Sequence, residues 1–187
     1  MFVSRLAVFL LAIAVVANVA ACGSSDAPRA SSAEDGIGVP QAVIASANTI
    51  SDLASGGDSE RVAAVAVSGF EFDFERPDVT LGEHLGSGDG ELLRRLVVVL
   101  DSAPGRRQSP FGNGAVQELW VYPALALELD SDWTEEDIDE ALSSGLFSSD
   151  ELAEFQIADA YLGYSVGLTP EGDWVFFTEG RVGRTPR

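Results

Sequence analysis

The chain has 187 residues, of which 30 are acidic and 11 basic, giving a formal net charge of −19. Every basic residue is an arginine. The excess of acidic residues argues against binding to nucleic acid and against binding to anionic lipid through a polybasic segment, since both need a cationic surface. The single cysteine, Cys22, leaves no partner for a disulfide and no set of ligands for a cysteine-based zinc site.

The first 21 residues have the layout of a secretory signal peptide. Arg5 is the only charged residue before Asp26, and a run that is apolar except for Asn18 follows it over residues 6–19. A membrane-spanning helix needs about 20 apolar residues. The run is therefore too short to be favoured as a permanent transmembrane anchor.

The end of this segment, Val19-Ala20-Ala21-Cys22, resembles the lipobox of bacterial lipoproteins. The resemblance implies cleavage between Ala21 and Cys22, followed by a diacylglyceryl group on the Cys22 sulfur and, usually, acylation of its amine. Two or three acyl chains hold a protein stably at a membrane, because each buried CH₂ contributes about 0.8 kcal/mol. Gly23 does not resemble the Asp of the inner-membrane retention signal, which favours the outer membrane if the organism has one. The alternative is an ordinary secretory signal with a chance cysteine.

Composition divides the rest of the chain into three parts. Residues 22–37 are rich in Ser, Ala, Asp and Gly, which predicts a flexible tether after the lipidated cysteine. Residues 38–180 have the length and apolar content of one globular domain. Residues 181–187 are short, polar and basic, so we expect this tail to fray. The resemblance to a known family ends at the lipobox.

The domain is expected to begin with a helix and a strand. Apolar side chains recur at loose helical spacing over residues 41–54, which favours a helix. Phe70, Phe72 and Phe74 then alternate with acidic residues, a pattern typical of a half-buried strand. Pro77 is expected to end that strand.

The middle of the domain is harder to interpret from its pattern. Residues 82–91 are rich in glycine and are expected to form a loop. Residues 91–102 fit a helix by their leucines and a strand by three consecutive valines, so both remain open. Leucines and valines alternate with other residues over 116–130, which predicts a strand interrupted or kinked at Pro123.

Two segments with the same capping pattern follow. Thr134 with Asp137, and Ser148 with Glu151, place an N-cap residue three positions before an acid, as in a capping box. We therefore predict two short helices joined by a turn at Gly145, over residues 134–144 and 149–162.

The C-terminal part of the domain predicts a hairpin. TPEGD, between two segments rich in β-formers, is a turn signal. Strands and helices do not alternate regularly along the chain. The pattern favours an α+β fold with an antiparallel sheet, a pair of short capped helices and a C-terminal β-hairpin.

The acids of this chain are distributed unevenly. Residues 108–180 contain 16 acids and no basic side chain, and four arginines stand just before them: Arg94, Arg95, Arg106 and Arg107. We expect ion pairs between these arginines and the acidic stretch. Such pairs cannot neutralise the excess.

The chain offers few residues that suggest catalysis or metal binding. His84 is the only imidazole, lies in the expected loop and belongs to no recognised motif. Asp130 and Asp132 have the first spacing of an EF-hand, but Glu135 stands where that loop needs glycine. They remain candidates only for a different calcium site. The sequence predicts no catalytic set, no cofactor and no assigned metal site.

The larger aromatic residues have two interpretations. They could line a sugar-binding groove, but they fall at strand and helix positions that are usually buried, so a place in the core is favoured. The residues concerned are Trp120, Tyr122, Trp133, Tyr161, Tyr164 and Trp174.

The leading functional hypothesis is a non-catalytic, lipid-anchored lipoprotein of the cell envelope. It would act as an interaction or assembly module, with an envelope protein or polysaccharide as partner and no nucleic acid. One alternative is a module that binds a small ligand or Ca²⁺ through the acidic region 128–159. Another is a hydrolase of envelope polysaccharide that uses a pair of carboxylates.

Overall fold

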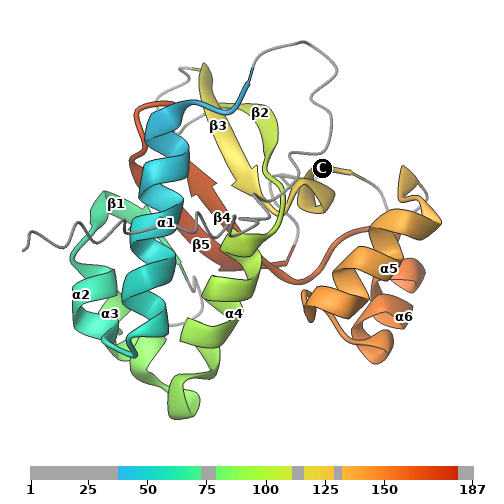
Figure 1. Ribbon diagram of the computed structural model, residues 1–187, viewed down its shortest axis with the longest axis horizontal. Helices are drawn as coiled ribbons and strands as arrows, with labels where there is room; N and C mark the ends of the chain where they lie inside the picture. The colour runs from blue at the N-terminus through green and yellow to red at the C-terminus, as the bar shows by residue number, and fades with distance from the viewer. Residues whose placement is uncertain (1–37, 73–78, 111–115, 129–131, 181–187) are drawn as a thin grey trace, which may run out of the picture.

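A five-stranded sheet covered by helices forms the centre of the computed structural model (Figure 1), which describes residues 38–72, 79–110, 116–128 and 132–180. Its elements are α1 (Gln41–Ser55), α2 (Ser59–Ala63), β1 (Ala66–Glu71), α3 (Leu81–Gly86), η1 (Gly88–Gly90), α4 (Glu91–Asp101), β2 (Gly105–Pro110), β3 (Val116–Tyr122), η2 (Ala124–Leu127), α5 (Glu135–Ser144), α6 (Ser149–Ala158), β4 (Tyr164–Leu168) and β5 (Trp174–Glu179).

The strands lie in the order β1-β5-β4-β3-β2, and all neighbours are antiparallel except β1 and β5. The predicted α+β class and the C-terminal hairpin are confirmed. In that hairpin Thr169 and Asp173 close the turn, with the Asp173 carbonyl accepting from the Thr169 amide at 2.9 Å. The parallel pair is not visible in the sequence, because Ala66 and Trp174, which are partners in it, lie more than a hundred positions apart.

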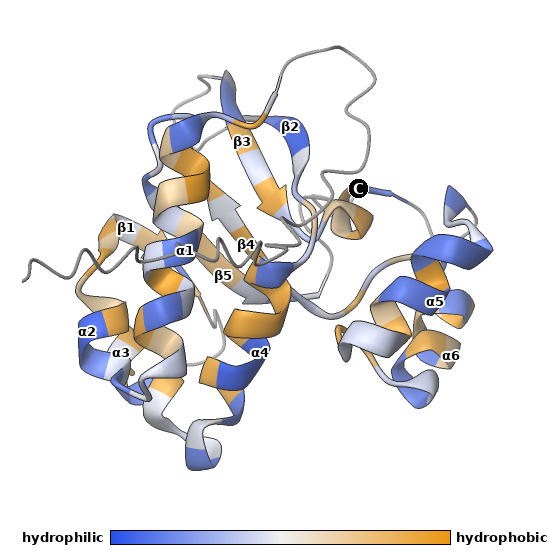
Figure 2. Ribbon diagram, viewed as in Figure 1, coloured by the Kyte–Doolittle hydropathy of each residue, from blue (hydrophilic) through white to orange (hydrophobic). Residues whose placement is uncertain are grey.

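Helices α1 and α4 lie side by side over one face of the sheet (Figure 1). The predicted first helix is confirmed, and its buried residues recur every three or four positions: Val43, Ala47, Ile50 and Ala54. The ambiguous segment 91–102 is a helix, since Leu93, Leu96, Val99 and Leu100 all fall on the face turned to the core. Figure 2 shows both helices with an apolar side and a polar side.

The prediction of a loop at residues 82–91 is wrong. Thr80 and Glu83 form a capping box, with the Thr80 hydroxyl accepting from the Glu83 amide at 3.3 Å, and α3 follows. The sequence contains this capping-box pattern, Thr-x-x-Glu, but the glycines that follow it favoured the prediction of a loop. His84 therefore lies on a helix, where it is buried and its ring centre is 5.5 Å from that of Phe72.

The predicted strand through Pro123 is confirmed only up to Tyr122. Pro123 has no amide hydrogen to donate, and the chain turns there into η2. The side chain of Leu127 then lies against Gly105, at a distance that leaves no room for a Cβ on Gly105. Leu125 and Leu127 are thus part of a turn folded over β2, not of a strand.

Helices α5 and α6 form a separate pair beside the sheet (Figure 1), which we call the helical hairpin (residues 132–160). Both predicted capping boxes are present: Thr134 accepts from the Asp137 amide at 3.2 Å, and Ser148 accepts from the Glu151 amide at 3.2 Å. Gly145 makes the turn with a φ of 75°. The second helix ends at Ala158 and not at 162, because Asp159 adopts a left-handed conformation.

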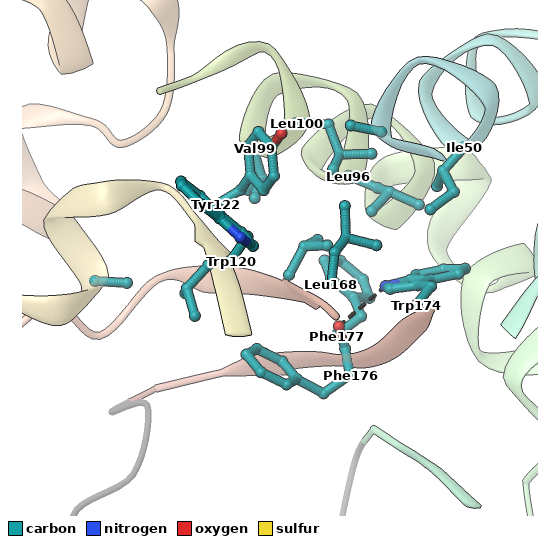
Figure 3. Packing of buried hydrophobic residues seen from close by; sticks show 14 of the residues in the cluster. Ile50, Leu96, Val99, Leu100, Trp120, Tyr122, Leu168, Trp174, Phe176 and Phe177 are labelled. Atoms are coloured by element: carbon teal, nitrogen blue, oxygen red, sulfur yellow. Dashed lines mark hydrogen bonds between the residues drawn. The ribbon is translucent and has the colours of Figure 1, made fainter. Parts of the chain in front are cut away.

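Aromatic side chains fill the core, as expected from their positions. Trp120, Trp174 and Phe177 are almost fully buried (Figure 3), and Tyr122 is buried beside them with its pKa raised to about 12 by desolvation. A second aromatic cluster holds the helical hairpin together and consists of Trp133, Phe147, Phe155 and Tyr161. Of the six predicted core aromatics, only Tyr164 is half-buried. This arrangement leaves little aromatic surface for a sugar.

Candidate functional site

Several predicted site residues lie outside the described part of the chain. Cys22, the cleavage position after Ala21, the tether and Asp130 all belong there, so lipidation stays a prediction. No helix within residues 38–180, apart from the undescribed gaps, is long and apolar enough to cross a membrane.

The second calcium candidate, Asp132, is exposed at the start of the helical hairpin. Partial desolvation raises the pKa of Glu128, and the nearby carboxylates of Asp137 and Asp132 raise it further. These three carboxyls therefore repel one another. Among the described residues no group of three His, Cys, Asp or Glu side chains is arranged to hold a metal ion.

The structure brings charged residues together at a different place, between α4, α6 and the strand ends. A pocket of about 170 Å³ opens there, which we call the seam pocket. Its charged lining consists of Arg95, Glu151, Glu154 and Glu179, and its apolar lining includes Val99, Leu146, Phe155 and Leu162. The helical hairpin thus meets the sheet across a small hollow that contains three carboxylates and one guanidinium.

Arg95 is already engaged within this pocket. Its Nη2 lies 3.2 Å from Oε1 of Glu151, and its Nε lies 3.3 Å from Oε1 of Glu91 on the same helix. The pair with Glu151 joins α4 to α6, and, because both side chains are about one-third exposed, it contributes at most about 1 kcal/mol. The expected pairing of the arginine cluster with the acidic stretch is confirmed here and between Arg106 and Glu118, 3.8 Å apart.

Glu151 is held in its ionised form. Burial raises its pKa, but the amide and hydroxyl of Ser148 and the Arg95 guanidinium together outweigh burial and lower it. A carboxyl that serves as a general acid needs the opposite shift, a raised pKa. Among the described carboxyls, the pKa of Asp101 and of Glu128 is raised, and neither residue lines the seam pocket.

Glu154 and Glu179 differ from Glu151. Within the described residues no basic side chain lies at ion-pair distance from either of them, although both line the seam pocket. Both are exposed. The pocket therefore has an excess of negative charge after Arg95 has been counted, and it suits a cationic group with an apolar stem.

The wall opposite the helical hairpin is made by the segment that leads into β4. The Tyr161 hydroxyl donates to the Tyr164 carbonyl at 2.8 Å and fixes this segment, and burial raises the pKa of Tyr161. The amide of Gly180, just after β5, donates to the carbonyls of Leu162 and Gly163, each at 3.1 Å. The end of β5 is thus attached directly to the lining of the pocket.

No local pattern predicts this pocket, because its charged residues lie between positions 95 and 179 and share no motif. Comparison of the chain with protein-family models, curated proteins and solved structures finds no match. The candidate site therefore rests on its geometry alone.

Proposed function

We propose that this protein is a lipid-anchored module of the cell envelope that binds a partner and catalyses no reaction. The anchor is inferred from the segment Val19–Cys22, which stands at the end of a signal-peptide pattern and is followed by the tether. Two or three acyl chains on Cys22 would attach the chain to a membrane, and the tether would separate the domain from the lipid headgroups.

The helical hairpin is the surface that best supports partner binding. It lies at one side of the sheet (Figure 1) and exposes acidic side chains along α5, among them Glu136, Asp139 and Glu140. Ile157 on α6 is 88% exposed, the largest exposure among the described large apolar residues. An acidic surface of this kind attracts basic partners and speeds their association. We infer that the partner is an envelope protein with a basic face.

A second candidate, binding of a small ligand, is favoured by the seam pocket. Its size suits an ammonium or guanidinium group, and Glu154 within the acidic region 128–159 supplies a carboxylate. Ca²⁺ is less well supported, since the described carboxylates do not converge as calcium ligands do. The hydrolase alternative is less well supported by the seam pocket, where the pKa of Glu151 is lowered and not raised as a general acid requires.

Crosslinking of the anchored protein in intact cells tests the proposed surface. We expect the triple variant Glu136→Gln, Asp139→Asn and Glu140→Gln to capture its partner about tenfold less than the wild type, which corresponds to about 1.4 kcal/mol. The loss should shrink at high salt, since it arises from charges on the surface.

The matched control removes the same number of charges from other elements, through Asp52→Asn, Glu71→Gln and Glu171→Gln. All three positions are exposed and lie outside the helical hairpin. Equal capture by the control and the wild type is expected. If both triple variants lost the partner equally, general acidity and not the helical hairpin would be responsible, and the proposed surface would be wrong.

A further inference from the structure

An ion-pair network includes two of the residues that line the seam pocket. Arg95 contacts Glu91 on its own helix and Glu151 on α6. Arg94 binds the second oxygen of Glu91, with its Nη2 2.8 Å from Oε2. Two guanidinium groups thus face two carboxylates, and their charges cancel. The network as a whole therefore has no net charge that would repel another cation.

The other two carboxylates of the seam pocket, those of Glu154 and Glu179, add negative charge that no described basic side chain balances. Both residues are exposed. Glu154 belongs to α6 and Glu179 to β5, so one carboxylate stands on the helical hairpin and the other on the sheet. A cation held between them is attracted by both and would link these two parts of the molecule.

The remaining lining favours a cation that carries an apolar stem. It includes the buried side chains of Val99, Leu146 and Phe155 and the half-buried Tyr164. A metal ion would leave this apolar surface in contact with water, whereas the methylene groups of an arginine cover it. The guanidinium then binds carboxylates through paired hydrogen bonds, and it also stacks on aromatic rings. Arginine therefore matches the lining better than a simple cation does.

The size of the seam pocket distinguishes a side chain from a free ligand. Its volume is about 170 Å³. Pockets that enclose small-molecule ligands usually have roughly 300–1,000 Å³. A single side chain needs only a small pocket, because the molecule that carries it binds elsewhere as well. The volume therefore favours a partner protein over a free metabolite.

The seam pocket borders the surface proposed for partner binding. Glu154 and Ile157 lie three positions apart on α6, so their Cβ atoms are about 5–6 Å apart on the same side of the helix. Ile157 is 88% exposed. A partner that packs on Ile157 therefore reaches the pocket with one long side chain.

We propose that the seam pocket receives an arginine side chain of the partner protein. The guanidinium would lie between Glu154 and Glu179, and the methylene groups would pack on Val99 and Phe155. A side chain that fills a pocket within an interface often supplies much of the binding energy. This arginine would thus hold the complex together, and the acids of α5 would speed its formation. The inference rests on the proposed binding of a basic envelope protein and names the contact that holds it.

A short peptide tests the seam pocket without the partner. The chain from residue 22 onward is prepared with Cys22→Ser and a ¹⁵N label, and it is titrated with acetyl-Ala-Arg-Ala-amide. We expect saturable shifts of the amide signals of Leu162 and Gly163, with a dissociation constant on the order of 1 mM, as for a small fragment of an interface. The same peptide with citrulline, which keeps the shape of arginine without its charge, should cause no such shifts.

Charge variants separate the seam pocket from the general acidity of the domain. Glu154→Gln with Glu179→Gln should weaken binding of the arginine peptide by about tenfold, because both carboxylate contacts lose their charge. The matched control, Glu136→Gln with Asp139→Asn, removes equal charge from exposed positions that do not line the pocket and should leave the binding unchanged. Equal weakening by both pairs of substitutions, or equal binding of the citrulline peptide, would overturn the proposal.

Capture of the partner in intact cells shows whether the arginine belongs to a protein. Glu154→Gln with Glu179→Gln should reduce crosslinking to the partner by about tenfold. If the arginine peptide bound to the wild type but this variant still captured the partner fully, the pocket would belong to a free cation and the inference would be wrong. If the arginine peptide did not bind while the triple variant of α5 still lost the partner, the inference would be wrong and the proposed surface would stand.

Discussion

Replacing Trp174 by Ala is expected to lower the free energy of unfolding by about 3–5 kcal/mol, the usual cost of removing a large buried aromatic side chain. Trp174 is 1% exposed and lies where α1, β1 and β5 meet (Figure 3). The edge of its ring packs on Phe70, with the ring centres 4.6 Å apart. A single domain of this size has about 5–15 kcal/mol of stability in total, so the variant should be close to unfolding at 37 °C.

Urea denaturation measures this effect. The midpoint should fall while the slope stays constant, as for a loss of stability without a change in the surface exposed. Trp174→Phe separates the hydrogen bond from the packing. It removes the Nε1 donor, which lies 3.0 Å from the Phe176 carbonyl, and should cost about 1–2 kcal/mol, since the carbonyl stays buried. An Ala variant as stable as the wild type would show that Trp174 is not central to the core.

Replacing Phe155 by Ala is expected to release the helical hairpin while the sheet stays folded. Phe155 is 2% exposed, and its ring centre lies 5.4 Å from Phe147 and 5.3 Å from Tyr161. It also lines the seam pocket. The rings next to Phe155 belong to the helical hairpin and to the residue just after it, so a loss of about 3–5 kcal/mol there should appear as local unfolding of α5 and α6.

Hydrogen exchange distinguishes local from global unfolding. Amides of α5 and α6 should exchange faster in Phe155→Ala, whereas amides of β4 and β5 should keep their protection. Ile157→Ala on the same helix is the control, because that side chain is 88% exposed and its loss should change stability by less than about 0.5 kcal/mol. Equal acceleration throughout β4, β5, α5 and α6 would show that the helical hairpin and the sheet unfold as one unit.

The parts of the fold that could be predicted from the sequence are those specified by short-range chemistry. The capping boxes at Thr134 and Ser148 and the turn between β4 and β5 each depend on fewer than six neighbouring residues. In such segments the side chain that signals the structure also makes the stabilising hydrogen bond. Thr80 and Glu83 form the same kind of capping box. The helix after them was not predicted because the glycines that follow are typical of a loop.

The rest depends on contacts between distant parts of the chain. The segment 91–102 has leucines and valines that suit a helix or a strand. It forms a helix in the structure, where Leu96 and Val99 lie on the side that is buried in the core. β1 pairs with β5 although more than a hundred positions separate Ala66 from Trp174. The seam pocket likewise combines Arg95 with Glu179, and neither position has a local pattern that announces a site.

Metabolic labelling with palmitate tests the central claim, that this domain is held at a membrane through Cys22. The wild type should incorporate the label and sediment with membranes, because acyl chains on Cys22 would attach it to the lipid. Cys22→Ala should incorporate none and be recovered in the soluble fraction, while Cys22→Ser controls for the loss of the thiol alone and should behave as Cys22→Ala does. Label that persists in Cys22→Ala, or membrane attachment of that variant at the wild-type level, would contradict the account.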